Sequence, residues 1–360
     1  MAPALRVMIT PWLDRWLRTA VEMGASDLHL IAGVPPAYRV NGEILLEDGD
    51  ALTAEQIQQT VGELLNEDQR QTFEREWELC ISLCHPEAGR VRLTIYRRSG
   101  SPEVSCRFCG RRIGSREDLG LPAKLDELAS RPHGLVIITG PAGAGKTTTL
   151  NYLVDRINSQ RRCKVVTIED PIEFVHENKR AIVVQQEVLT DTHSFNRALH
   201  HALRQDPDVI VVGEVRDHEA MATMLAGAET GHLVLATLHS PSVVHALERI
   251  IGVFEGNAQR QVILQLSNCL QGVVAQDLVP SIDRSRRVLA FELLTVNSAV
   301  RKIIRENALH QLETCMQTGG KEGMMLMDAC LHDLYCRCAI SYDTALSRAR
   351  NPDRITKRNA

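Results

Sequence analysis

The segment "IITGPAGAGKTTTLNYLV", residues 137–154, constrains the fold of this chain more than any other part of the sequence. A short apolar run leads into a glycine-rich turn, and a lysine, three threonines and a helical pattern follow. Residues 140–147, "GPAGAGKT", fit the motif GxxxxGK[ST] in full. A strand, this loop and a helix in that order predict a P-loop, an element of α/β domains that holds nucleotide phosphates.

The residue types of the loop suit phosphate binding. Glycines let backbone N–H groups approach phosphate oxygens, and the lysine reaches the β- and γ-phosphates. The hydroxyl of Thr147 is the expected protein ligand of Mg²⁺. We therefore expect the whole loop to bind ATP, through Gly140, Pro141, Ala142, Gly143, Ala144, Gly145, Lys146, Thr147 and Thr148.

A P-loop alone predicts binding, and carboxylates elsewhere predict turnover. Glu214 follows the apolar run 209–212, where a carboxylate at the end of a central strand can polarise water. A solvated acidic turn is the alternative. Glu169, Asp170 and Glu173 follow another apolar run, and we expect one or more to hold Mg²⁺ or its waters. The alternative for these three is a capped helix start around Pro171.

Two histidines flank a further apolar run in "TGHLVLATLHS", residues 230–240. His232 precedes the run and His239 follows it. Histidines at the two ends of one strand can sense the γ-phosphate from a sheet edge, whereas a lone histidine is more often structural. The residues alone leave both interpretations open.

Hydrophobic patterning divides the chain into two parts. Residues 1–112 read as α+β, with five alternating segments predicted as strands and two helices over 54–65 and 67–77. From about 133, short continuous apolar runs alternate with helical patterns, which predicts parallel strands buried on both faces. After 240 we expect mainly helix, apart from "RVLAFELL" at 287–294.

Composition limits the classes of function. The 360 residues carry 41 basic and 45 acidic side chains, a net charge of −4, and only 4% are aromatic, so the chain offers no basic or stacking surface for nucleic acid. Its apolar runs are shorter than the roughly 20 residues of a membrane-spanning helix. Charged residues near the N-terminus replace the apolar stretch of a signal peptide, so we expect a cytoplasmic protein.

The ten cysteines allow one further hypothesis. Cys106 and Cys109 form a CxxC pair, which Cys80, Cys84 and His85 could complete as a zinc site. Structural zinc sites usually join two tight pairs, and "ELCISLCH" has the wider CxxxC spacing. Small buried side chains are the alternative.

Four stretches in this order resemble the secretion ATPase superfamily, the hexameric motors of type II secretion and type IV pili. "GPAGAGKTTTL" resembles its Walker A, "TIEDPIEF" its Asp box, "RQDPDVIVVGEVRD" its Walker B and "AETGHLVLATLHS" its His box. "GASDLHLIAGVPPAYRVNGEI" extends the likeness to the N-terminus. The resemblance implies an α/β protein with a PAS-like α+β domain over 1–112, a linker over 113–124 and a RecA-like ATPase domain with C-terminal helices over 125–360.

Within the superfamily, the chain is most similar to the pilus retraction motors. The four-cysteine zinc insertion of many assembly and secretion ATPases is missing, and "AVRKIIRE", 299–306, resembles the C-terminal helix motif of the retraction family. The resemblance implies a Mg²⁺-dependent, ATP-hydrolysing homohexamer that powers pilus retraction and twitching motility. A general type II secretion or pilus assembly ATPase remains the alternative, followed by a non-hydrolysing regulatory subunit.

The resemblance also implies partners and further site residues. Arg92 and Arg107 correspond to arginines that reach the nucleotide of a neighbouring subunit, a role suited to a planar, always charged donor group. The implied partner is the inner-membrane platform protein of the pilus machine, and not nucleic acid. The motor is then peripheral to the membrane, at the cytoplasmic face of the inner membrane.

Overall fold

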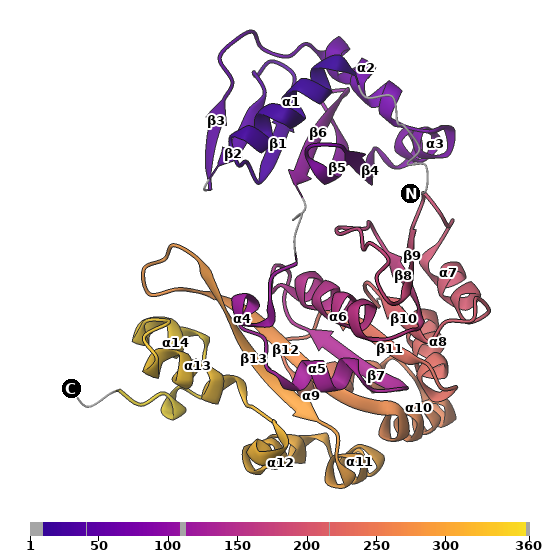
Figure 1. Ribbon diagram of the computed structural model, residues 1–360, viewed down its shortest axis with the longest axis vertical. Helices are drawn as coiled ribbons and strands as arrows, with labels where there is room; N and C mark the ends of the chain where they lie inside the picture. Colours follow the sequence, from indigo (N-terminus) through magenta and orange to yellow (C-terminus); the bar gives the residue numbers. More distant parts are fainter. Residues whose placement is uncertain (1–9, 41, 109–112, 216, 358–360) are drawn as a thin grey trace. The chain divides into compact units, whose positions relative to one another are not determined.

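The computed structural model describes residues 10–40, 42–108, 113–215 and 217–357. Contacts divide the chain into two compact units (Figure 1). The N-terminal unit comprises Met1–Arg112, Pro171–Val175 and Glu187–Ser194. The C-terminal unit comprises Ile113–Asp170, His176–Gln186 and Phe195–Ala360.

The N-terminal unit is built on a six-stranded antiparallel sheet in the order β3-β2-β1-β6-β5-β4. The five predicted strands and both predicted helices are present, and β3 is an additional edge strand. The elements are α1 (Pro11–Glu22), β1 (Asp27–Leu30), β2 (Ala37–Val40), β3 (Glu43–Leu46), α2 (Ala54–Leu64), α3 (Glu67–Glu76), β4 (Glu78–His85), β5 (Gly89–Arg98) and β6 (Ser101–Phe108).

Alternation along the strands gives this sheet one apolar and one polar face. Val91, Leu93 and Ile95 of β5 are fully buried in a core shared with the helices. Side chains on the other face include Arg92 and Arg107, which stand opposite each other in the β5–β6 register. The period-2 pattern of the sequence therefore decides which arginines share a surface.

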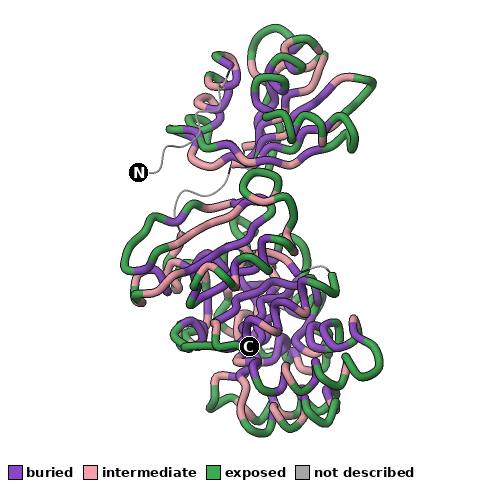
Figure 2. The backbone as a smooth tube through the Cα atoms, turned by 90° about the vertical axis from the view of Figure 1, so that its right-hand side faces the viewer, coloured by how far each residue is buried: buried purple, intermediate pink, exposed green. Residues whose placement is uncertain are grey.

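The C-terminal unit contains a seven-stranded sheet in the order β13-β12-β7-β11-β10-β8-β9. Neighbours from β12 to β8 pair in parallel, and β13 is antiparallel to β12. The strands are β7 (Gly134–Thr139), β8 (Lys164–Glu169), β9 (Ile182–Glu187), β10 (Val209–Val212), β11 (Leu233–Leu238), β12 (Leu270–Pro280) and β13 (Arg287–Thr295). β7, β10 and β11 are buried along their whole length, as the continuous apolar runs predict (Figure 2).

Helices cover both faces of this sheet. Leu135 and Ile137 of β7 pack with α7–α10, whereas Val136 and Ile138 pack with α5 and α6. The helices are α4 (Arg116–Leu119), α5 (Lys124–Ala129), α6 (Lys146–Gln160), α7 (Phe195–Ala202), α8 (His218–Glu229), α9 (Val243–Gly252), α10 (Gly256–Cys269), α11 (Ser298–Arg305), α12 (Leu312–Thr318), α13 (Met327–Cys336) and α14 (Tyr342–Arg348). Together with the sheet they form the doubly covered α/β layer that the sequence predicts.

Two segments differ from the prediction. The prediction that the chain after 240 is mainly helical, with 287–294 as the exception, is wrong. Residues 270–280 form a second strand, the eleven-residue β12. Polar residues in this strand interrupt the apolar pattern by which a buried strand is predicted. One of them, Gln276, is only 1% exposed, and its Nε2 donates a hydrogen bond of 2.8 Å to Thr149 Oγ1. Residues 113–124, expected to be a linker, contain the short helix α4, which begins at a Ser115 capping box. The same segment buries Leu121 in the core of the C-terminal unit.

Buried His176 gives the C-terminal unit a testable pH dependence. Burial lowers the pKa of its imidazole from 6.5 to about 4, where Nε2 lies 3.0 Å from Asn151 Oδ1 of α6. Between these values the unfolded chain binds a proton that the folded chain does not, so the free energy of unfolding decreases as pH falls from 6.5 to 4, by up to about 3 kcal/mol. Urea unfolding at pH 7 and at pH 4.5 should show that the free energy of unfolding decreases less in His176→Gln than in the unchanged protein. An unchanged decrease, matching that of exposed His133→Gln, would contradict this account.

Candidate active site

The P-loop connects β7 to α6, as the sequence predicts. Gly140, Gly143 and Gly145 have φ of 147°, 77° and 83°, which L side chains rarely adopt. A Cβ on Gly140 would also lie 2.3 Å from the Gln276 carbonyl oxygen of β12. Glycine at 140 is therefore required by the backbone conformation and by the neighbouring strand.

Lys146 lies in the first turn of α6 and is 8% exposed. Its Nζ donates hydrogen bonds of 2.9 Å to the carbonyl oxygens of Gly140 and Pro141. Nζ also lies 3.3 Å from His239 Nδ1. Burial lowers the pKa of this ammonium group, and the nearby Glu214 carboxylate acts in the opposite direction. The lysine is thus held at the mouth of the loop, where an anionic ligand would stabilise its charge.

His239 and Glu214 meet Lys146 at the carboxyl edge of the sheet. His239 directly follows β11, and Glu214 follows β10 after Gly213. His239 Nε2 lies 3.2 Å from Glu214 Oε1, so the imidazole contacts the lysine with one nitrogen and the carboxylate with the other. β7, β11 and β10 are parallel neighbours, and their carboxyl ends therefore bring together three residues far apart in sequence.

Glu169 ends β8 at the same sheet edge. It is 6% exposed, and its Oε1 accepts hydrogen bonds from Thr167 Oγ1 at 2.7 Å and Gln185 Nε2 at 3.0 Å. Asp170, the next residue, is exposed. The half-buried Thr147 hydroxyl and these carboxylates are oxygen ligands of the kind Mg²⁺ prefers, so the donor set fits this ion.

Glu173, which the sequence suggests as a residue that could hold Mg²⁺ or its waters, contacts an arginine in the structure. Its Oε1 lies 3.7 Å from Arg92 Nη1, in the part of the chain assigned to the N-terminal unit. The contact involves side chains that are 36% and 38% exposed, and we do not place Glu173 among the residues around Lys146.

The two histidines of residues 230–240 lie at opposite ends of the central strand β11. His232 precedes β11, its carbonyl accepts from the Gly134 N–H at the start of β7, and its Nδ1 lies 3.0 Å from the Gly227 carbonyl oxygen. A six-residue strand separates it from His239 by roughly 20 Å. Within the chain, the structure brings His239 to the P-loop, and His232 lies at the other end of β11.

Arg92 and Arg107 lie side by side on the polar face of the N-terminal sheet. Arg107 Nε donates to Asp27 Oδ1 at 2.9 Å, and its side chain is 70% exposed. Arg92 Nε lies 3.1 Å from Cys80 Sγ, in addition to its contact with Glu173. Each guanidinium group has a carboxylate beside it, Glu173 for Arg92 and Asp27 for Arg107, and these carboxylates offset the repulsion between the two adjacent arginines.

The zinc hypothesis does not fit the sheet. Cys80 and Cys84 lie on the polar face, whereas Cys106 is fully buried in the apolar core. Cys109 lies outside the described residues. Among the residues that the structure describes, no group of three or more histidine, cysteine or acidic side chains could hold a metal ion. Burial raises the pKa of the Cys106 thiol to about 12, as for a small core residue.

Sequence reasoning missed the residues that support the site. Thr139, fully buried at the end of β7, accepts from the Ser240 N–H at 2.9 Å and donates to the Ser240 carbonyl oxygen at 2.8 Å. Arg249 of α9 donates to the His239 carbonyl oxygen at 2.8 Å. A polar residue in the otherwise apolar "GLVIIT" was the only local signal for Thr139, and nothing local marks Arg249.

Comparison with known proteins defines the class. Residues 111–351 match the family described as "Type II/IV secretion system protein". The chain is 38% identical to the "Type IV pilus retractation ATPase PilT" of Pseudomonas aeruginosa, over 94% of this chain and 98% of that protein. It is 36% identical to a "Twitching motility protein" of Neisseria gonorrhoeae, over 94% and 91% respectively. The chain therefore belongs to the type II/IV secretion system protein family.

A solved structure supports a narrower assignment. The chain aligns with a crystal structure of "the Pilus Retraction Motor PilT and Bound ADP" at a TM-score of 0.88 and 41% identity, covering 95% of this chain and 98% of the other. The match includes the whole α/β arrangement around the P-loop. The chain is an ATPase of the pilus-retraction type.

No helix among the described residues is long and apolar enough to cross a membrane.

The placement of Glu214 yields a direct test. Glu214→Gln should retain ATP binding, because the P-loop and Lys146 are intact, and lose turnover by roughly 10²-fold or more. Lys146→Ala should lose binding itself. Nucleotide binding measured by titration calorimetry and phosphate release separate the two effects.

The matched control is Glu177→Gln, which removes an exposed carboxylate from the same unit and should change neither quantity. Near-normal hydrolysis in Glu214→Gln would exclude Glu214 as the residue that activates water.

Proposed function

We propose that this chain is the Mg²⁺-dependent ATP-hydrolysing motor of type IV pilus retraction, working as a homohexamer. The single observation that carries the enzymatic part is the convergence of Lys146, His239 and Glu214 at one sheet edge. The pilus assignment is supported by relatives named for pilus retraction and twitching motility, which match nearly the whole chain.

The geometry accounts for binding. When ATP enters the loop, its phosphate oxygens replace the carbonyl oxygens of Gly140 and Pro141 as acceptors for Lys146 Nζ. The N-terminus of α6 and the backbone N–H groups of the glycine loop add positive potential. Thr147 would hold Mg²⁺, with Glu169 and Asp170 as candidates for its waters; the ion would supply charge neutralisation between the β- and γ-phosphates.

The proposed role of the Glu214 carboxylate is to activate water. Glu214 would accept the proton of the attacking water, or orient that water, from the end of β10. His239, in contact with both Lys146 and Glu214, would connect the γ-phosphate position to the carboxylate. Loss of the γ-phosphate then changes the contacts of His239, which is the kind of local change that drives domain movement in switching proteins.

The N-terminal unit would complete the site of a neighbouring subunit. We infer that it is a PAS-like domain, that the C-terminal unit is RecA-like, and that Arg92 and Arg107 reach the nucleotide in trans. Their positions opposite each other on adjacent strands would present two guanidinium groups to one set of phosphates. The platform protein at the cytoplasmic face of the inner membrane is the proposed partner that receives the movement.

A general secretion or assembly ATPase is the second candidate. Helix α10 ends at Cys269 and β12 begins at Leu270, so the chain runs from helix to strand without room for an inserted zinc module at that point. This continuity favours the retraction motor.

Mixed rings test the arginines. Lys146→Ala and Arg107→Ala subunits should each be inactive alone, since an arginine supplied in trans can contribute around 10³-fold or more. Rings assembled from both should recover ATP turnover, because some interfaces receive an intact P-loop and an intact arginine. Arg39→Ala, which alters another arginine of the polar face, should remain active by itself. No recovery in verified mixed rings would leave Arg107 with a role inside its own chain.

Helix α11 carries the motif "AVRKIIRE" and divides its two arginines between different tasks. Val300 and Ile304 of this helix are fully buried, whereas Ala299 is exposed. Arg301 Nη1 donates to the carbonyl oxygens of Ser267 and Asn268 at 2.7 and 2.6 Å, and so caps the C-terminus of α10. Arg305 is exposed. The two arginines therefore differ: Arg301 is bound to the end of α10, and Arg305 is a surface charge.

Arg305→Ala should leave ATP turnover within a few-fold, since surface substitutions usually change stability by less than about 0.5 kcal/mol, and yet abolish pilus retraction in cells. Arg301→Ala should lower the free energy of unfolding by roughly 1 kcal/mol or more, because two helix-end carbonyls lose a charged donor. Purified-protein turnover is compared with pilus length in cells. Arg260→Ala, an exposed arginine of α10, is the control, and normal retraction with Arg305→Ala would reduce the motif to packing.

A further inference from the structure

The backbone that follows His239 is held by side chains from distant elements. We call residues 239–243 the post-β11 segment; it leads from the site to the start of α9. Thr139 and Arg249 fix its first two residues, as described above. Two further backbone groups of the segment, the Pro241 carbonyl and the Val243 N–H, are bound by a residue of the chain after α14 and by a residue of β13.

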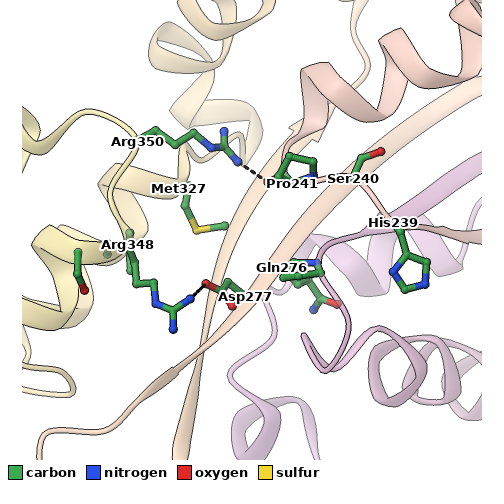
Figure 3. A pocket seen from close by; sticks show the side chains of 11 residues that line it. His239, Ser240, Pro241, Gln276, Asp277, Met327, Arg348 and Arg350 are labelled. Carbon is green, nitrogen blue, oxygen red and sulfur yellow. Dashed lines mark hydrogen bonds and ion pairs between the residues drawn. The ribbon is translucent and has the colours of Figure 1, made fainter.

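Arg350 and Glu292 bind the second half of the segment together. Arg350 Nη2 donates to the Pro241 carbonyl oxygen at 2.8 Å (Figure 3). Its Nη1 lies 2.8 Å from Glu292 Oε2. Glu292 Oε2 also accepts from the Val243 N–H at 3.1 Å. The Glu292 side chain is only 3% exposed, so the arginine supplies the charge that makes burial of this carboxylate tolerable.

Arg350 is itself anchored through its backbone. Its N–H donates to Asp328 Oδ1 at 2.8 Å, and the Asn351 N–H donates to Oδ2 of the same carboxylate at 3.1 Å. Asp328 lies in the first turn of α13 and is 4% exposed. The guanidinium is therefore presented from a fixed position, and α13 is tied through Asp328 and Arg350 to the post-β11 segment.

We propose that Arg350 is a positioning residue for ATP hydrolysis, which acts with Glu292 to hold the post-β11 segment so that His239 stays between Lys146 and Glu214. Without the guanidinium, the Pro241 carbonyl oxygen loses its donor and the buried carboxylate loses its partner, so the segment must rearrange to hydrate both. The inference rests on the proposed function, because it assumes that His239 contributes to turnover.

Steady-state kinetics of the full-length protein test this. Arg350→Ala should lower kcat for ATP hydrolysis by about tenfold or more, since small displacements of catalytic groups are costly. KM for ATP should stay within about twofold, because the hydrogen bonds and the ion pair of Arg350 go to Asp328, Pro241 and Glu292 rather than to the P-loop. Arg350→Lys should restore part of kcat, since a lysine keeps the charge but cannot bind Pro241 and Glu292 as a planar fork.

The matched control is Arg348→Ala. Arg348 lies two residues away and reaches Asp277 Oδ2 at 3.4 Å, on β12 rather than on the post-β11 segment (Figure 3). This variant should keep both kcat and KM. If Arg350→Ala folds poorly, Glu292→Gln provides a second route, because the amide keeps an acceptor for the Val243 N–H and removes only the ion pair; it should also lower kcat at unchanged KM.

A cycle with His239→Ala separates the two levels of the claim. The inference predicts that Arg350→Ala lowers kcat no further when His239 is already absent. An equal further loss in that background, or full turnover in Arg350→Ala, overturns the positioning role while leaving the proposed function intact. Full turnover in His239→Ala overturns the proposed role of His239, and the positioning role with it.

Discussion

The contact of His239 with both Lys146 and Glu214 is the interaction on which the rest of the account depends. It joins the residue that we expect to bind phosphate to the residue that we expect to activate water. Lys146 comes from the helix that follows β7, Glu214 from the end of β10 and His239 from the end of β11. Only a parallel order in which β11 lies between β7 and β10 places them together, so the sheet topology and the chemistry are one constraint.

Buried polar groups are costly unless they are bound, and several groups at this edge are bound by side chains rather than within secondary structure. Buried Thr139 binds the backbone of Ser240, and Gln276 links β12 to α6 through Thr149. Glu292 and Arg350 extend the same principle to the post-β11 segment. The site is therefore supported by a shell of hydrogen bonds that reaches the C-terminal helices, which gives nucleotide chemistry a physical connection to distant parts of the unit.

Much of this could be predicted where the signal is local. The glycines of 140–147 and the apolar runs before Gly140 and Gly213 specify a loop and buried strands by their own conformational demands. β12 escaped prediction because burial of Gln276 depends on a partner, Thr149, 127 positions away in sequence. His232 and His239 looked equivalent because sequence shows that they flank one strand, whereas the site occupies only one end of it. Arg350 has no local signal, because its role is defined by Glu292 and Pro241.

We propose that one chain carries only part of an active site, which a neighbour's arginines complete. The most direct measurement is the rate of ATP hydrolysis per chain as a function of protein concentration, with particle mass determined on the same samples. The account predicts little turnover where the protein is monomeric and a steep rise in rate per chain as rings form. Monomers that hydrolyse ATP at the same rate per chain as assembled rings would contradict it.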